Sequence, residues 1–335
     1  MNHRLNILIR VASVFLLSIF VLLQVWGDSG FSSRYPNLFI QKRIFEQHFR
    51  RLSPKHLLHI NGNLTNIGFI SQIFLINLPH RDDRRTRSIG VLQTLNIDAY
   101  IVPALSIHSL DVLKHSQLVK LGSITLNEIA CWASHMQIWI DISNSKSNQT
   151  WTLILEDDID LEMETIKVLE SFPKQIWKTS DMIYLGHCDN PPGKLLYTGM
   201  NGYRVHYAKH PSCTHAYAIR KQGARKLIEL ISKPRRAIDQ EIVHLNDAGQ
   251  ISILSIHPPL ALQNTFSPSN RSDVNPSKNT WKYSVKRVVN SFFEWARGVE
   301  SIIQLNDSAL ARADLNKADR LRITLEQQAC SFLND

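Results

Sequence analysis

Short apolar runs alternate with amphipathic stretches through the middle of the chain. The runs Ile70–Leu78 and Trp151–Leu155 contain few polar positions, which is typical of strands buried on both faces of a sheet. Shorter runs at Ala99–Val102, Met182–Leu185 and Ala216–Ile219 predict further strands. Because predicted helices separate these strands, the pattern indicates an α/β fold with a mostly parallel central sheet and some antiparallel edge pairing.

The predicted helices have recognisable starts. Asp82 and Asp83 open a stretch that continues to about Leu95, and acidic residues favour a helix N-terminus. Thr125 and Glu128 have the spacing of a capping box, in which each side chain bonds the other's backbone amide. The helix that they begin should place five apolar residues on one face, namely Ile129, Trp132, Ala133, Met136 and Ile140. A further helix is expected at residues 223–231.

The N-terminus carries an apolar segment without charge, Val11–Trp26. Its sixteen residues, counted from 11 to 26, are close to the roughly 17–25 needed to span a bilayer. Arg4 and Arg10 precede it and Asp28 follows, so the positive-inside rule leaves the N-terminus cytosolic. A cleaved signal peptide is the alternative, but Val25-Trp26-Gly27 is a poor cleavage site. We therefore expect a single-pass type II protein of the Golgi or endoplasmic reticulum membrane.

Composition divides the chain into four parts. Residues 1–27 form the predicted cytosolic tail and anchor, and residues 28–68, which lack sustained periodicity, form a stem. The α/β pattern occupies residues 69–266. Beyond this, residues 267–335 turn to Ser, Asn, Lys and Pro and then to helical patterns, which predicts a C-terminal helical extension.

Two features agree with a lumenal location of everything beyond the anchor. Four Asn-x-Ser/Thr triplets could accept N-glycans, at Asn63, Asn148, Asn270 and Asn306. The four cysteines, which could pair in three ways in an oxidising lumen, are Cys131, Cys188, Cys213 and Cys330. We favour a bond between Cys188 and Cys213, because each lies near the end of a predicted strand.

The chain is basic, with 38 Lys and Arg against 29 Asp and Glu, a net charge of +9. Nucleic acid, a membrane surface or a phosphate-bearing substrate would each fit this charge. The sequence has no basic stripe interleaved with aromatic residues, and it has a predicted anchor and glycosylation triplets. Nucleic-acid binding is therefore not expected.

Three consecutive carboxylates follow a predicted buried strand, at Glu156, Asp157 and Asp158. Ligands bind at the carboxyl ends of strands in open α/β sheets, and clustered carboxylates favour a hard cation such as Mn²⁺ or Mg²⁺. If the extended geometry continues, Glu156 and Asp158 share one face as paired metal ligands and Asp157 faces away. Asp160 would extend the set. The alternative is a solvated loop or a helix N-terminus before residues 161–170.

The order of several short motifs resembles glycosyltransferase family 25, the family of lipooligosaccharide and procollagen galactosyltransferases. The matching blocks, over about residues 70–265, are Ile76-Asn77-Leu78, Arg81-Asp82-Asp83-Arg84-Arg85, Asn127-Glu128-Ile129-Ala130-Cys131 with Ser134-His135 and Trp139, Leu153-Ile154-Leu155-Glu156-Asp157-Asp158, Tyr184-Leu185-Gly186, Thr214-His215-Ala216-Tyr217, Gly223-Ala224 with Leu227, and Asp239-Gln240. One departure is Ala130, where the family usually has Gly.

The resemblance implies a GT-A-like nucleotide-sugar fold, a donor that is commonly a UDP-hexose, and transfer with inversion to a glycan or glycoprotein acceptor. The residues of these blocks that we expect around the donor are Asn77, Leu78, Arg81, Arg84, Arg85, Ser134, His135, Asp157 and His215. Arginine matches phosphate geometry bidentately. The alternative for two of the three arginines is a solvated helix face paired with Asp82 and Asp83, and for His135 a core histidine bonded to a carboxylate.

Two late residues complete the expected site. Asp239 is the candidate that takes the proton of the acceptor hydroxyl, with a helix N-cap as the alternative role. His257 is the candidate third metal ligand beside Glu156 and Asp158, which would offset charge on the leaving nucleotide. The competing function is a non-catalytic, membrane-tethered glycan-binding or assembly protein that keeps the fold without the chemistry.

Overall fold

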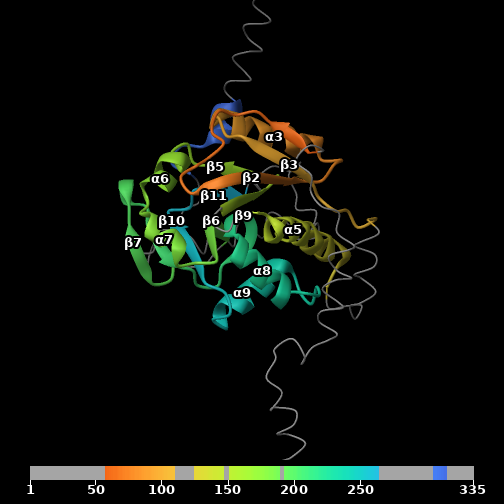
Figure 1. Ribbon diagram of the computed structural model, residues 1–335. Coiled ribbons are helices and arrows are strands. Elements are labelled where there is room, and N and C mark those ends of the chain that lie inside the picture. Colours follow the sequence, from red (N-terminus) through yellow and green to blue (C-terminus); the bar gives the residue numbers. More distant parts are fainter. Residues whose placement is uncertain (1–56, 110–123, 147–150, 189–191, 264–304, 315–335) are drawn as a thin grey trace, which may run out of the picture. The chain divides into compact units, whose positions relative to one another are not determined.

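The computed structural model describes residues 57–109, 124–146, 151–188, 192–263 and 305–314 (Figure 1). The predicted anchor and most of the predicted stem lie outside the described residues, as does the helical pattern at 285–303. Among the described residues, the structure has no helix that is both long enough and apolar enough to cross a membrane.

A mixed sheet lies at the centre of the described residues. Its nine strands have the spatial order β1-β3-β2-β4-β9-β6-β10-β8-β7. Their bounds are β1 Leu58–Ile60, β2 Ile70–Asn77, β3 Ala99–Pro103, β4 Trp151–Glu156, β6 Met182–Cys188, β7 Leu195–Thr198, β8 Arg204–Tyr207, β9 Ser212–Arg220 and β10 Ile253–His257. A separate two-stranded sheet pairs β5 (Ile159–Leu161) with β11 (Ala261–Gln263).

Most strands of the large sheet run in one direction. Strands β2 and β3, β2 and β4, and β6 and β10 are parallel pairs. Strand β9 is antiparallel to both β4 and β6, so those two strands also run the same way. Strands β1 and β8 are antiparallel to their neighbours β3 and β10. The α/β prediction is therefore confirmed, with a sheet that is mixed and mostly parallel.

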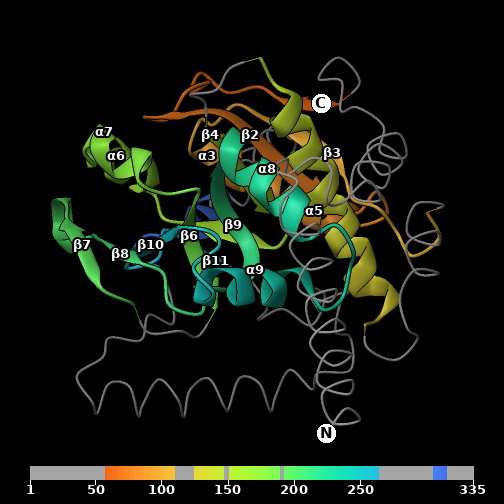
Figure 2. The same ribbon diagram turned by 60° about the horizontal axis from the view of Figure 1, so that its bottom comes forward.

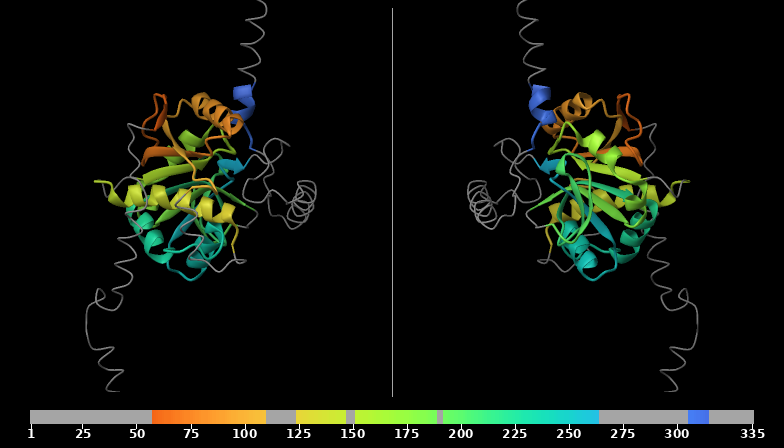
Figure 3. Two further views of the ribbon diagram at one scale, coloured as in Figure 1. Left: turned by 90° about the vertical axis from the view of Figure 1, so that its right-hand side faces the viewer. Right: turned by 90° about the vertical axis from the view of Figure 1, so that its left-hand side faces the viewer.

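Helices cover both faces of this sheet (Figures 1 and 3). Their bounds are α3 Asp82–Thr94, α5 Leu126–Asn144, α6 Thr165–Ser171, α7 Lys174–Lys178, α8 Lys221–Leu230 and α9 Ile238–Asp247, with a 3₁₀ turn η2 at Met200–Gly202. Helix α3 lies on one face, whereas α5 and α8 pack side by side on the other (Figure 2). Successive side chains of β2 point to opposite faces of the sheet, and Leu75 belongs to the same core cluster as Val91 of α3, whereas the buried Phe74 does not.

The predicted start of α5 is confirmed. The Thr125 hydroxyl accepts a hydrogen bond from the Glu128 amide at 3.2 Å, and the Glu128 carboxylate accepts one from the Thr125 amide at 2.8 Å. This capping box fixes where α5 begins. Residues 131 and 135 consequently lie one helical turn apart on its surface.

The structured region extends beyond the predicted limits of 69–266. Strand β1 lies in the segment assigned to the stem and pairs with β3, and Ile67 is fully buried. At the other end, Ala309 and Leu310 join the main core, and the Leu310 amide donates to Asp160. The segment 305–314 lies beside α3 (Figure 3). Because the Asp160 carboxylate binds this segment, Asp160 does not extend the acidic cluster.

Strand β9 brings candidate site residues together, because it is antiparallel to both of its neighbours. Its first residues lie beside the last residues of β4 and β6, and Leu155 of β4 pairs with Ala216 of β9. Glu156 and His215, each one residue further toward this edge, are thereby brought to the same end of the sheet. The carboxyl ends of parallel strands are where open α/β sheets bind ligands.

Candidate active site at the carboxyl end of strand β4

The acidic cluster is divided by a turn. Strand β4 ends at Glu156, and Asp157 and Asp158 form a turn before β5. The Nη1 atom of Arg84 lies 3.0 Å from Asp157 and 3.4 Å from Asp158, so both aspartates face the same guanidinium. The expected alternation, with Asp157 facing away from its neighbours, fails because the backbone does not remain extended after Glu156.

Asp157 is held by three residues of the first βα unit. Its carboxylate accepts hydrogen bonds from Asn77 at 2.7 Å and from Arg84 at 3.0 Å. Its backbone carbonyl accepts one from the Ser88 hydroxyl at 2.7 Å. Burial raises the pKa of Asp157, and the charge of Arg84 only partly opposes this effect. Asp157 thus fixes the turn to β2 and α3.

Asp158 is the most strongly perturbed carboxyl of the site. It is 5 % exposed and accepts a hydrogen bond from Gln263 at 3.0 Å through Oδ2. Burial, followed by the charge of Glu156, raises the pKa of Asp158 to about 7. Its Oδ1 atom is buried and accepts no hydrogen bond from any residue that the structure describes. A buried carboxylate oxygen without a partner is costly, unless a cation binds it.

Glu156 faces helix α5 and strand β9. Its Oε1 atom accepts a hydrogen bond from the Thr214 hydroxyl at 2.7 Å and lies 3.3 Å from Nε2 of His135. Burial alone would raise the pKa of Glu156, but these two hydrogen bonds, together with the charges of His135 and His215, outweigh burial and lower it. Glu156 therefore stays ionised beside Asp158, and its side chain remains 23 % exposed.

A chain of hydrogen bonds behind Glu156 sets the orientation of His135. The Trp139 indole donates to the Tyr217 hydroxyl at 2.9 Å, and that hydroxyl lies 2.8 Å from Nδ1 of His135. The hydroxyl of Tyr217 can accept a second hydrogen bond or donate its own proton, so Nδ1 of His135 is a donor in one tautomer and an acceptor in the other. In the second tautomer the ring proton lies on Nε2, toward Glu156. This arrangement matches the alternative interpretation of His135 as a core histidine bonded to a carboxylate.

Asp239 and His215 lie at the same edge of the sheet. Asp239 is in the first turn of α9, which begins after Ala237, so it is not the N-cap. Its carboxylate accepts the Cys213 amide at 3.2 Å and the Gln240 amide at 2.8 Å. The charges of both Asp239 and Glu156 raise the pKa of Cys131, after burial as the main cause. The carboxylates of Asp239 and Glu156 therefore both lie close enough to Cys131, on helix α5, to act on it.

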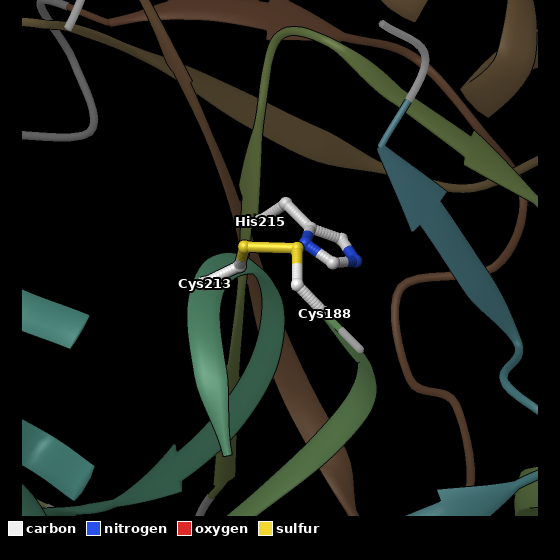
Figure 4. A group of neighbouring side chains, drawn as sticks. All are labelled: Cys188, Cys213 and His215. Atoms are coloured by element: carbon white, nitrogen blue, oxygen red, sulfur yellow. A yellow bond between two sulfur atoms is a disulfide. The ribbon is translucent and has the colours of Figure 1, made fainter. Parts of the chain in front are cut away.

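The predicted disulfide between Cys188 and Cys213 is confirmed (Figure 4). It joins the end of β6 to the start of β9, and His215 lies beside it. The two sulfur atoms and a ring nitrogen of His215 lie within 4.8 Å of one another. Because both sulfurs are oxidised, they are not thiolate ligands, and this group is not a metal site.

His257 is separated from the acidic cluster by the order of the strands. Two strands, β9 and β6, lie between β4 and β10. Three strand spacings amount to roughly 14 Å. The ring of His257 instead lies 5.2 Å from that of His187 and 5.4 Å from that of His206, measured between centroids. The structure does not bring His257 together with Glu156 and Asp158 as a third metal ligand.

The three arginines after β2 have different roles. Arg81 forms two hydrogen bonds of 2.9 Å with Asp83, and Arg85 pairs with Asp82. The pairing with Asp82 and Asp83 matches the alternative for two of the three arginines, but the Arg81 side chain is only 13 % exposed and precedes the helix. Arg84 alone is buried, at 5 % exposure, and serves the aspartates rather than a phosphate.

Two other expected donor contacts have local structural partners. The Ser134 hydroxyl donates to the Ala130 carbonyl at 2.8 Å and accepts the Leu105 amide at 2.9 Å, which ties α5 to the chain after β3. The Leu78 carbonyl accepts the Arg81 amide at 2.9 Å. Both residues shape the turn regions around the site.

The surroundings of Asp158 show whether a hard divalent ion would fit at the end of β4. Its unpartnered oxygen, the ionised Glu156 nearby and the partial exposure of Glu156 provide oxygen ligands of the kind that Mn²⁺ and Mg²⁺ take. The residues present therefore fit such an ion, which Asp158 and Glu156 would hold.

Several functional contacts were not predicted from the sequence. Gln263 binds Asp158 from a strand in another sheet, and Thr214 binds Glu156 across the β4–β9 pair. Tyr217 and Trp139 support His135. Thr214, Tyr217 and Trp139 all belong to the motifs quoted above. Each has a side chain that can form a hydrogen bond within an otherwise apolar segment, and this could have indicated a role in the site. Gln263 had no such signal.

Comparisons with known proteins identify the family to which the chain that carries this site is similar. The model of a family described as "Glycosyltransferase family 25 (LPS biosynthesis protein)" matches residues 70–242. The human protein named inactive glycosyltransferase 25 family member 3 is 31 % identical over 202 residues, which are 56 % of this chain and 33 % of that protein. Procollagen galactosyltransferase 1-A of Xenopus laevis is 30 % identical over 205 residues, 56 % of this chain and 33 % of that protein.

Mouse procollagen galactosyltransferase 2 is 29 % identical over 179 residues, 48 % of this chain and 28 % of that protein. The chain therefore spans about a third of the length of these curated relatives. The matched segment runs from β2 to α9, includes Asn77, the acidic cluster, His215 and Asp239, and covers more than half of the chain. The chain belongs to glycosyltransferase family 25.

Proposed function

We propose that this protein is a metal-dependent glycosyltransferase with a GT-A-like nucleotide-sugar fold. It transfers a hexose, galactose or a similar sugar, from a nucleotide diphosphate donor such as a UDP-hexose to a glycan or glycoprotein acceptor, with inversion. Family membership supports the reaction class, and the relatives named procollagen galactosyltransferase support the sugar.

The observation that carries the proposal is the state of Asp158. A buried carboxyl with a pKa near 7, an unpartnered oxygen and an ionised neighbour lowers the stability of the folded protein. Such a group persists at functional sites because a ligand compensates it. Mn²⁺ or Mg²⁺ held by Asp158 and Glu156 would supply positive charge for the leaving diphosphate.

The surrounding residues have supporting roles in this mechanism. Arg84 and Asn77 hold the turn through Asp157, so that Asp158 is presented at the strand end. His135 and Thr214 keep Glu156 ionised and oriented. Asp239, on the neighbouring helix, is the proposed acceptor of the proton that leaves the acceptor hydroxyl.

We further propose a lumenal catalytic domain, in the Golgi or endoplasmic reticulum, behind an N-terminal anchor. The disulfide between Cys188 and Cys213 supports an oxidising compartment. The apolar segment Val11–Trp26 with its flanking charges supports the anchor.

The test is transfer by the full-length chain, purified in detergent. A screen of nucleotide diphosphates by thermal unfolding, with and without Mn²⁺, identifies the donor base. Release of the nucleotide from the matching donor is then measured with Mn²⁺ and in excess chelator. Asp158→Asn should reduce the rate at least a hundredfold, whereas Asp247→Asn, on the exposed end of α9, should leave it unchanged. Equal rates in chelator or in Asp158→Asn would overturn the metal-dependent mechanism.

A second candidate function is binding without turnover, and one observation favours it. Relatives from human and mouse at 31 % and 29 % identity are named inactive. A non-catalytic protein would show donor-dependent or glycan-dependent stabilisation in the same screen, but no nucleotide release with any donor that binds.

A further inference from the structure

A group of three unlike ligands lies beside the acidic turn. Cys131 and His135 lie four residues apart on one face of α5, and Glu156 ends strand β4 opposite them. Their ligand atoms all lie within 4.8 Å of one another, and Nε2 of His135 is 3.3 Å from Oε1 of Glu156. In a tetrahedral zinc site, bonds of about 2.0–2.1 Å place neighbouring nitrogen and oxygen ligands about 3.3 Å apart.

The hydrogen bonds that usually orient the side chains of a metal site are also present around this group. Histidine ligands of metals usually hold their other ring nitrogen in a hydrogen bond that fixes the ring. Nδ1 of His135 lies 2.8 Å from the Tyr217 hydroxyl, which in turn accepts the Trp139 indole. Glu156 is likewise oriented by Thr214. In the tautomer with its proton on Nδ1, His135 donates to the Tyr217 hydroxyl, and the Nε2 lone pair is left for an ion.

The electrostatic surroundings favour a cation over an anion. Burial, and then the charges of Glu156, Asp239, Asp158 and Glu128, raise the pKa of Cys131, so its thiolate needs a cation beside it. Cys131 is a free thiol among the described residues, and it keeps some exposed surface, as does Glu156. An ion can therefore reach the group from solvent, and its binding releases the thiol proton to water.

We propose that Cys131, His135 and Glu156 form a Zn²⁺ site with an open fourth position, distinct from the all-oxygen site at Asp158. The thiolate and the imidazole select zinc over Mn²⁺ and Mg²⁺. The two sites share Glu156. If the proposed transferase mechanism holds, zinc therefore withdraws a ligand from the Mn²⁺ site and inhibits transfer.

The test measures metal binding without donor or acceptor, so its result is independent of whether the chain transfers sugar. Co²⁺ is titrated into the purified full-length chain, and the charge-transfer absorption of a cobalt–thiolate bond is recorded in the near ultraviolet. The expected result is one Co²⁺ per chain with this absorption, displaced by Zn²⁺ but not by Mg²⁺. Absence of the thiolate band overturns the proposal.

Variants of single residues test whether Cys131 provides the thiolate that binds the metal. Cys131→Ser should abolish the band and weaken zinc binding at least tenfold in competition with a chromophoric chelator. Cys330→Ser, the matched change at the cysteine outside the described residues, should keep both. Retention of the band in Cys131→Ser, or its loss in Cys330→Ser, contradicts the assignment. Glu156→Gln, a change at a partly exposed side chain, is the second variant should Cys131→Ser not fold, and it should also weaken zinc binding tenfold; unchanged affinity overturns the site.

Discussion

The Nη1 atom of Arg84 lies 3.4 Å from Oδ2 of Asp158, where both side chains are almost completely buried. The same nitrogen is 3.0 Å from Asp157, so one positive charge serves two buried carboxylates. Burial raises the pKa of both aspartates, and the charge of Arg84 opposes this rise, together with hydrogen bonds from Asn77 to Asp157 and from Gln263 to Asp158. The site is therefore a charged network within the fold, rather than an acidic patch on its surface.

Removal of Arg84 should destabilise the protein strongly. Arg84→Ala leaves two buried carboxyls without their cation, for which a loss of about 3–5 kcal/mol in the free energy of unfolding is expected. Urea unfolding of the purified chain measures the loss. Arg85→Ala is the control, because Arg85 pairs with the exposed Asp82 and should cost less than about 1 kcal/mol. Similar losses in the two variants would contradict a central role for the buried pair.

Tyr217 and Tyr184 provide a matched pair of buried tyrosines. The Tyr217 hydroxyl bonds Trp139 and His135, whereas the Tyr184 hydroxyl has no hydrogen-bond partner among the described residues. Tyr217→Phe should therefore cost about 1–3 kcal/mol and weaken metal binding, since His135 loses its support. Tyr184→Phe should change stability by less than about 0.5 kcal/mol. Thermal unfolding and metal titration of both variants test this, and equal effects would count against the hydrogen-bond chain.

The sequence was sufficient where local patterns determine the structure. The apolar runs of β2 and β4 and the capping box of α5 were predicted because burial and helix capping depend on nearby residues. Strand β10 (Ile253–His257) was not predicted, although three of its first four residues are apolar and its run is as long as others that were predicted as strands. Strand β1 was missed because three residues are too few for periodicity to show.

The site was less predictable than the fold, because its partners come from distant segments. Arg84 reaches Asp157 across 73 positions, and Gln263 reaches Asp158 across 105. Neither pairing leaves a mark in local sequence. The antiparallel insertion of β9 also decides that Thr214 meets Glu156 and that His257 does not, and this strand order follows from tertiary packing.

The disulfide should contribute to stability through the loop that it closes. Cys188 and Cys213 are 25 positions apart, and a loop of this length corresponds to about 3.5 kcal/mol in the chain-entropy model. The double change Cys188→Ala with Cys213→Ala should lower the free energy of unfolding by this amount. It should also reduce nucleotide release, because Asp239 binds the Cys213 amide. Cys330→Ser is the control in both assays, and a double variant as stable as the wild type would refute the expectation.

The buried histidines should make the protein sensitive to acid. Burial, and then the charge of His215, lowers the pKa of His187 to about 4, and burial with the charges of His187, His206 and Arg204 lowers that of His257 to about 3. The unfolded chain protonates these residues near pH 6.5, so it binds more protons than the folded protein between about pH 6.5 and 4.

Folding stability should therefore fall as the pH decreases through this range, by about 2 kcal/mol at pH 5 for each of these two histidines. His187→Asn should reduce the loss between pH 7 and pH 5 in urea unfolding, because a neutral amide cannot take up the proton. His244→Asn, a change at an exposed histidine of α9, should retain the full loss. If His187→Asn and the wild type lose the same stability on acidification, His187 is not held in its neutral form by the fold.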